Sequence, residues 1–100
     1  MASGSKLERD FQAKLIQELK AIFPECIILK NDSSYIQGIP DLTIFVRDRW
    51  AMLEVKRSTK ASVRPNQRYY VDLTDQMSFS RFISPENKDE VINELQGYFS

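Results

Sequence analysis

The spacing of apolar residues divides the chain into helical and extended segments. Steps of three and four between apolar residues predict helices over residues 5–22, 65 to about 75, and 86–98. Alternation or short continuous apolar runs predict strands over residues 25–30, 41–46, 50–56 and 78–83. Prolines support this division, because Pro24 follows the first helix, and Pro65 and Pro85 suit the first turns of the other two.

The element order αβββαβα predicts an α/β protein of the α+β type, with a mixed central sheet and a C-terminal helix. One hundred residues form a single compact domain, residues 1–100, without an internal repeat or linker. Residues 1–5 lack the apolar stretch of a signal peptide, and we expect them to be disordered or left over from cloning. No apolar run reaches the roughly 20 residues of a membrane-spanning helix. An intracellular, cytoplasmic location is therefore the expectation.

Three charged residues interrupt the apolar pattern of the second and third predicted strands. Asp41 opens one strand, and alternation places Glu54 and Lys56 on one face at the end of the next. A hairpin would bring the Asp41 carboxylate beside Glu54. Two carboxylates and an ammonium suit a hard divalent cation and a phosphate. The alternative is a cross-strand salt-bridge network, a common surface arrangement that contributes roughly 0 to 1 kcal/mol to stability.

The composition restricts the chemistry available to such a site. The chain has no histidine, which excludes Ser-His-Asp hydrolases, histidine-ligated zinc hydrolases and histidine-dependent nuclease motifs. Its single cysteine, Cys26, excludes an intramolecular disulfide and a multi-cysteine zinc site, and its apolar neighbours indicate a core residue. The remaining acid–base groups are carboxylates, lysine, tyrosine and water bound to a metal.

Charge is unevenly distributed, although 14 basic and 14 acidic residues give a formal net charge of zero. Residues 86–94 contain four acids and one lysine, whereas residues 55–71 contain five basic residues and no acid. Because the basic segment directly follows the candidate site, it favours a polyanionic partner; the alternative is a solvated surface. Its basic residues are Lys56, Arg57, Lys60, Arg64 and Arg68.

Gly38-Ile-Pro-Asp41, twelve intervening residues and then Glu54-Val-Lys56 resemble the PD-(D/E)XK nuclease signature. Glu8 on the first helix is similar to the glutamate that commonly joins that site. Arg64-Pro-Asn-Gln67 is similar to the glutamine motif of the VRR-NUC branch, and the compact chain also resembles archaeal Holliday junction resolvases. The chain departs from the branch at Gln76-Met-Ser78, where a glycine is common before the last core strand. The resemblance implies a restriction-endonuclease-like αβββαβ core.

The resemblance also implies a bound Mg²⁺, for which Mn²⁺ would substitute, and no small-molecule cofactor. The implied ligands are Asp41, Glu54 and the backbone carbonyl of Val55, with Glu8 binding directly or through water. From the helix pattern alone, Glu8 is equally a capping-box carboxylate paired with Ser5.

Further roles follow from the same resemblance. Lys56 would orient a water or stabilise charge on the phosphoryl group, and Gln67 would position Lys56, a water or a phosphate. The predicted DNA-binding residues, which would contact neighbouring phosphates, are Arg57, Lys60, Arg64 and Arg68.

The expected function is that of a metal-dependent DNA endonuclease, a phosphodiester hydrolase. A structure-selective enzyme of the Holliday junction resolvase type is favoured, acting in DNA repair or recombination as a homodimer that makes two symmetric cuts in branched DNA. Such stand-alone nucleases often belong to a phage or mobile element, which would place the protein in the host cytoplasm. Candidates for the dimer surface are Phe79, Phe82, Tyr98 and Phe99, and candidates for base stacking are Tyr69 and Tyr70.

Two alternatives stay open. A nuclease domain of the same fold would act on flaps, single strands or nonspecific duplex, as a monomer. A non-catalytic nucleic-acid-binding module would use the basic segment without hydrolysis. Incubating the protein with Mg²⁺ and labelled junction, flap and duplex DNA distinguishes these possibilities, since only a nuclease cuts the DNA.

Overall fold

The computed structural model describes residues 3–100, with side chains from Lys6 onward. Three helices and four strands follow the predicted order and confirm an α+β fold with a C-terminal helix. They are α1 (Ser3–Ile22), β1 (Ile27–Lys30), β2 (Leu42–Val46), β3 (Arg49–Val55), α2 (Pro65–Met77), β4 (Ser80–Ile83) and α3 (Lys88–Tyr98).

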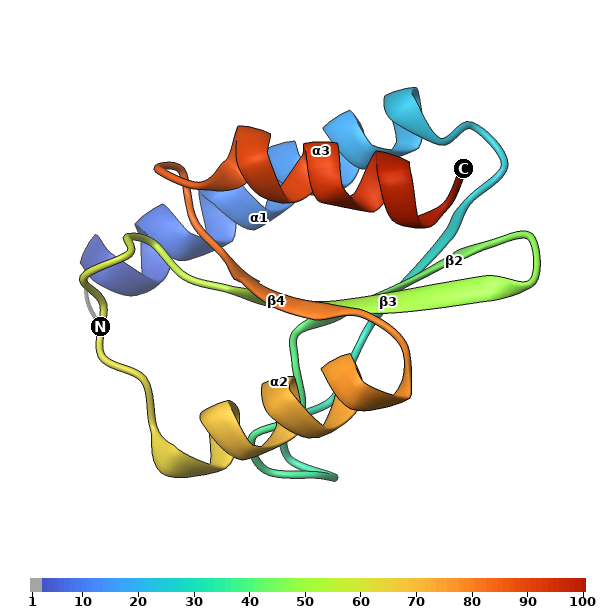
Figure 1. Cartoon of the computed structure of the whole chain (residues 1–100). Coiled ribbons are helices and arrows are strands. Elements are labelled where there is room, and N and C mark those ends of the chain that lie inside the picture. Colours follow the sequence, from blue (N-terminus) through green and yellow to red (C-terminus); the bar gives the residue numbers. More distant parts are fainter. Residues whose placement is uncertain (1–2) are drawn as a thin grey trace.

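The four strands form one mixed sheet in the order β1-β2-β3-β4 (Figure 1). β1, β2 and β3 are antiparallel neighbours, and β4 runs parallel to β3. A parallel pair needs a long crossover, which α2 supplies between β3 and β4. Helices α1 and α3 cover one face of the sheet, and α2 covers the other (Figure 1).

The hydrophobic core lies between the sheet and the helix pair α1 and α3. Leu42, Ile44 and Val46 of β2 are at most 1% exposed, as their alternation predicts. On the opposite face of the sheet, α2 packs on β3 and β4, and Phe45 of β2 is exposed to solvent. The helices contribute Leu15, Leu19, Val91, Ile92 and Leu95 to the core. None of the described helices combines the length and apolarity needed to cross a membrane.

Several element ends differ from the prediction because a turn or a neighbouring element decides them. β1 begins at Ile27, since Pro24 and Glu25 form a turn. Helix α2 continues to Met77, so β4 starts only at Ser80. Helix α3 begins at Lys88, after a turn over the preceding residues.

The start of α1 corrects two expectations. The helix begins at Ser3, so Ser5 lies inside it and Glu8 lies beyond its first turn; the capping-box interpretation of Glu8 is wrong. Leu7, expected in the buried stripe, is exposed. Of the predicted tail, residues 1–2 lie outside the described residues, and the backbone of residues 3–5 belongs to α1.

Two of the four aromatic residues considered for a dimer surface are buried in the core of the single chain. Phe79 and Phe99 are 6% and 2% exposed and belong to the core. Tyr98 is partly buried and packs against both. Phe82 is also partly buried, beneath the guanidinium of Arg68, whose carbon lies 4.6 Å from the ring centroid. Phe79 and Phe99 are therefore too buried to form a dimer surface, whereas Phe82 and Tyr98 stay partly exposed.

Candidate functional site

The β2–β3 hairpin brings Asp41 and Glu54 together, as the sequence pattern predicts. Leu42 pairs with Leu53, so Asp41 and Glu54 lie at neighbouring strand ends. Asp41 Oδ2 accepts a 2.8 Å hydrogen bond from the Val55 N–H. At the far end, a two-residue turn with Arg47 at a φ of 57° fixes the register of the hairpin.

Gln67 connects the sheet residues to α2. Its Nε2 donates to Glu54 Oε2 at 3.1 Å, and its Oε1 accepts from Lys56 Nζ at 2.8 Å. The same Oε1 accepts the N–H of Arg64 at 3.0 Å, which satisfies a free donor at the helix start. Lys56 Nζ also donates to the carbonyl of Ser62 at 3.0 Å and lies 3.9 Å from Glu54 Oε2. The lysine is therefore held from three sides.

Two adjoining clefts open onto these residues. The acidic cleft, of about 250 Å³, lies between the β1–β2 loop and the start of α2 and exposes the carboxylates. The basic cleft, of about 280 Å³, lies between α1, the loop after β3 and the start of α2. Both are lined by Glu8, Arg64 and Gln67. The acidic cleft adds Asp41, Glu54, Ser33, Ser34, Gln37, Gly38, Ile39 and Asn66, and the basic cleft adds Lys56, Arg57, Ala61 and Ser62.

The three carboxylates influence one another electrostatically. Burial raises the pKa of Glu54 to about 8, with a further increase from Asp41 and a smaller one from Glu8, opposed by Lys56. Burial also raises the pKa of Asp41, against the stabilising Val55 N–H and Lys56. The pKa of Glu8 is raised by burial and then by Asp41. The metal-free site therefore tends to retain a proton near neutral pH, chiefly on Glu54.

The donor atoms suit a hard cation such as Mg²⁺. The second oxygen of Asp41 receives no hydrogen bond from any described residue. The Glu54 carboxylate is approached by the Gln67 amide and by the backbone N–H of Asp41. Within residues 3–100, no three acidic, cysteine or histidine side chains are grouped closely enough to surround one ion. Mg²⁺ often uses only one or two carboxylates and keeps several waters. Asp41, Glu54 and the Val55 carbonyl fit that pattern, with Glu8 outside the direct ligands.

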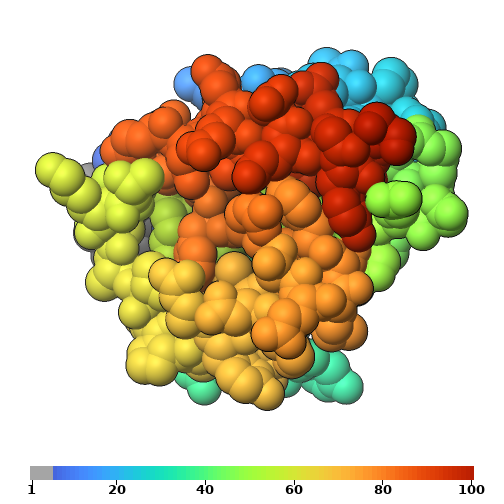
Figure 2. Space-filling model, viewed as in Figure 1, coloured from blue at the N-terminus to red at the C-terminus, as the bar shows by residue number. Residues whose placement is uncertain are grey.

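The predicted DNA-binding residues separate into two groups. Arg57 and Arg64 border the basic cleft. Lys60 lies exposed on the loop after β3, the yellow-green segment that projects from the surface in Figure 2. Arg68 lines neither cleft, because it packs on Phe82 and lies 3.9 Å from the Asp72 carboxylate.

One wall of the acidic cleft was not anticipated from sequence. Ser33, Ser34 and Gln37 lie between two predicted strands, in a segment whose pattern predicts only a connection. Asn66 lies inside the motif Arg64–Gln67 but had no predicted role. The available signal was Gly38, whose φ of 96° lets the loop pass against Asn66. A side chain at position 38 would collide with the Asn66 backbone.

Comparisons of the chain with protein-family models, curated proteins and solved structures give no match. Its function is therefore inferred from the residues of the site. Glu8 and Gln67, which are distant in sequence, line both clefts of this site. Gln67 also binds Lys56 and Glu54.

Proposed function

We propose that this protein is a metal-dependent DNA endonuclease that hydrolyses phosphodiester bonds. The observation that carries the proposal is the pairing of Asp41 and Glu54 at adjacent strand ends, where they line one cleft together with Glu8 and where Glu54 lies 3.9 Å from Lys56 Nζ. Glu54 is only 4% exposed, and burying charged carboxylates near one another is unfavourable unless a cation or a proton offsets their charge. Such groups in a cleft favour a functional site over the surface salt-bridge network that is the alternative.

The residues of the site have distinct roles in this proposal. Asp41, Glu54 and the Val55 carbonyl hold Mg²⁺ or Mn²⁺, and Glu8 interacts through a water. The cation lowers the pKa of water and offsets negative charge on the phosphoryl group. Lys56, fixed by Gln67 and the Ser62 carbonyl, donates to a phosphoryl oxygen or orients the attacking water. Gln67 is a positioning residue, because it holds Lys56 and Glu54 at once.

The adjoining basic cleft supports a polyanionic substrate. Arg57 and Arg64 border it directly beside the carboxylates, where they contact phosphates that flank the scissile bond. The similarity of the motif to Holliday junction resolvases favours branched DNA as the substrate. Each chain carries one such site, so a two-fold homodimer makes the two symmetric cuts that a four-way junction requires.

Cleavage assays test this function. The protein is incubated with labelled four-way junction, flap and plain duplex, in Mg²⁺ or in EDTA. Paired symmetric nicks on the junction in Mg²⁺ alone support the full proposal. If only the flap or the duplex is cut, the protein is a nuclease but not a resolvase. If the DNA stays intact in both Mg²⁺ and Mn²⁺ at concentrations where the protein binds it, hydrolysis is refuted and the protein is a non-catalytic binding module.

A further inference from the structure

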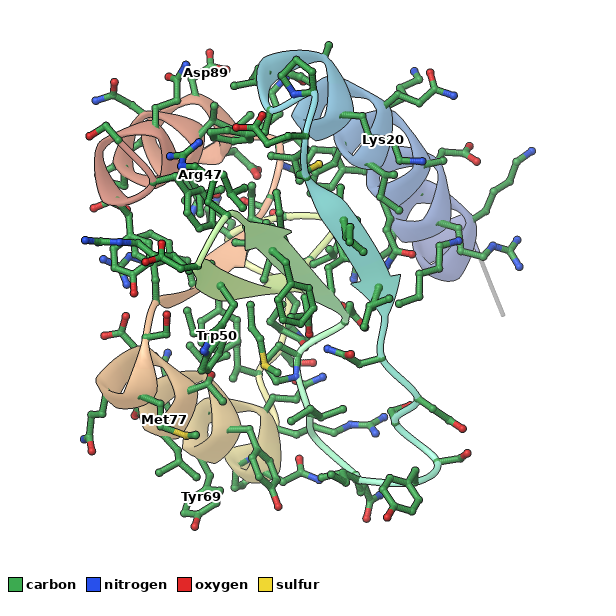
Figure 3. The ribbon with its side chains drawn as sticks, turned by 90° about the vertical axis from the view of Figure 1, so that its right-hand side faces the viewer. Lys20, Arg47, Trp50, Tyr69, Met77 and Asp89 are labelled. Atoms are coloured by element: carbon green, nitrogen blue, oxygen red, sulfur yellow. The ribbon has the colours of Figure 1, made fainter. Side chains whose placement is uncertain are left out.

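The loop between β1 and β2 is a fixed wall of the acidic cleft. The Asn31 side chain ties its base together, donating to the Pro40 carbonyl at 2.9 Å and to Thr43 Oγ1 at 2.8 Å. Asp32 Oδ1 accepts both the N–H and the hydroxyl of Ser34, at 2.9 and 2.6 Å. Figures 1 and 3 show the loop extending beyond the sheet, beside α2. Together with the close passage of Gly38 past Asn66, these contacts give the loop one defined shape.

Tyr35 lies at the tip of this loop and is 85% exposed, more than any other large apolar side chain among the described residues. It immediately follows Ser33 and Ser34, which line the acidic cleft, and Gln37 lines it two residues later. So exposed a ring adds little to folding. A tyrosine on a fixed turn is suited to stacking, because it has few side-chain torsions to immobilise on binding.

The dimensions of the acidic cleft favour a single nucleotide. Its volume of about 250 Å³ equals that of roughly eight molecules of liquid water. The cleft is partly open to solvent, so a base that is turned out of a stack can enter it from the surface. The carboxylates of Asp41 and Glu54 line this cleft, and Glu54 is almost fully buried. A phosphate that reaches these carboxylates must therefore enter the cleft.

The lining of the acidic cleft offers free hydrogen-bonding groups. The side-chain amides of Gln37 and Asn66 make no hydrogen bond to any side chain or backbone group of residues 6–100. An amide presents both donors and an acceptor, as the edge of an unpaired base requires. Stacking on an aromatic ring together with contacts to a base edge is how proteins bind unstacked nucleotides.

We propose that the acidic cleft and Tyr35 form a binding site for an unpaired nucleotide next to the scissile phosphate. Tyr35 stacks on the base, and Gln37 and Asn66 contact its edge. This inference rests on the proposed nuclease function and narrows its substrate to DNA with an unpaired nucleotide at the cut, as in a flap or where a base pair beside a branch point opens. Tyr35 does not itself line the cleft; it lies at the rim, between the lining residues Ser34 and Gln37 in sequence. Tyr69, a base-stacking candidate from the sequence, points away from the sheet on the outer side of α2 (Figure 3).

Equilibrium binding in Ca²⁺ tests the site with three probes: a single-stranded oligonucleotide, a flap with 2-aminopurine at the unpaired position beside the branch, and a plain duplex. Tyr35→Ala should weaken binding of the single strand and flap about tenfold and leave duplex binding unchanged. It should also abolish the change in 2-aminopurine fluorescence on binding. Tyr35→Phe, which keeps the ring, should bind all three DNAs within about twofold of the unchanged protein.

Tyr69→Ala is the matched control, since Tyr69 is also an exposed tyrosine and its ring lies edge-on to Tyr70. The nucleotide site would be overturned if Tyr69→Ala lost as much affinity for DNA as Tyr35→Ala. It would also be overturned if Tyr35→Ala weakened duplex binding as well, or weakened no binding at all. Cleavage by the unchanged protein separates this result from the proposed function. If the protein cuts DNA but Tyr35→Ala changes neither binding nor cutting, only the nucleotide site is refuted. If binding depends on Tyr35 but no DNA is cut in Mg²⁺, only the hydrolysis is refuted. Absence of binding to all three DNAs refutes both.

Discussion

Gln67 and Lys56 are joined by a 2.8 Å hydrogen bond from the lysine Nζ to the glutamine side-chain oxygen. The bond connects the end of β3 to the first turn of α2. Because the same oxygen accepts the N–H of Arg64, the start of α2 and the position of the lysine depend on one atom. The amide nitrogen of Gln67 then binds Glu54. A single side chain therefore couples helix capping to the geometry of the candidate site.

Gln67→Ala removes all three contacts and should lower kcat for DNA cleavage by about 10- to 100-fold, because Lys56 and Glu54 lose their common partner. KM should change less than threefold, since Gln67 is proposed to position other residues. The lost cap should also destabilise the fold by about 1 kcal/mol. Steady-state kinetics and thermal unfolding measure these effects. Gln76→Ala, at the exposed end of the same helix, should change neither, and a kcat loss as large there would contradict the assignment.

Asp41→Asn should abolish cleavage while the affinity for junction DNA stays within a few-fold. Asparagine keeps an oxygen that can accept the Val55 N–H, so the hairpin is retained, but it lacks the charge that a divalent cation requires. Cleavage and binding assays on the same preparation measure both quantities. Asp48→Asn, in the turn at the far end of the hairpin, is the control. Unchanged cleavage by Asp41→Asn would show that the cation, if one is used, is held elsewhere.

Without metal, the protein should lose stability as the pH rises from about 5 to 8. The pKa of Glu54 is raised from 4.5 to about 8 on folding, so the folded state holds a proton that the unfolded chain releases in this interval. Its contribution is fully present below about pH 4.5 and is lost as the pH passes through 8. The raised pKa values of Asp41 and Glu8 act in the same direction.

Glu54→Gln mimics the protonated acid and should flatten this dependence, leaving the variant more stable than the unchanged protein at pH 8 in EDTA. Denaturant unfolding at several pH values measures the slope. Glu90→Gln, on the exposed side of α3, serves as the comparison. A stability that rises between pH 5 and 8 in EDTA would mean that folding does not raise the pKa of Glu54.

Arg64 and Arg68 should behave differently, although the sequence suggests one basic surface. Arg64→Ala should weaken DNA binding and reduce its salt dependence by about one phosphate contact, because Arg64 borders both clefts. Arg68→Ala should affect stability more than binding, since its guanidinium packs on Phe82. Binding titrations between about 50 and 200 mM salt distinguish the two variants, because phosphate contacts make DNA affinity fall over this range. An unchanged slope for Arg64→Ala would place the phosphate contacts on other residues.

The sequence predicted what depends on local periodicity and failed where distant parts of the chain meet. Alternation located Asp41 and Glu54 at adjacent strand ends, since hairpin pairing follows directly from pattern and turn. The burial of Phe79 and Phe99 could not be foreseen, because it depends on how α3 packs on the sheet. The cleft wall near Gln37 was missed for a similar reason: it exists only because the β1–β2 loop lies against α2.

Gly38→Ala should destabilise the protein by about 1–3 kcal/mol. Gly38 has a φ of 96°, and a Cβ there would lie 2.8 Å from the carbonyl carbon and oxygen of Asn66. Either the loop or the start of α2 must move, so binding of single-stranded DNA should weaken as well.

Gly97→Ala supplies the opposite case, because Gly97 is near the end of α3 and a Cβ at this position would meet no atom within 4 Å apart from the adjacent backbone of its own helix. It should stabilise the fold by up to about 1 kcal/mol through its higher helix propensity. Urea unfolding and oligonucleotide binding measure both variants. Equal stabilities for Gly38→Ala and the unchanged protein would mean that the loop does not rest on α2, and the acidic cleft would then lack its second wall.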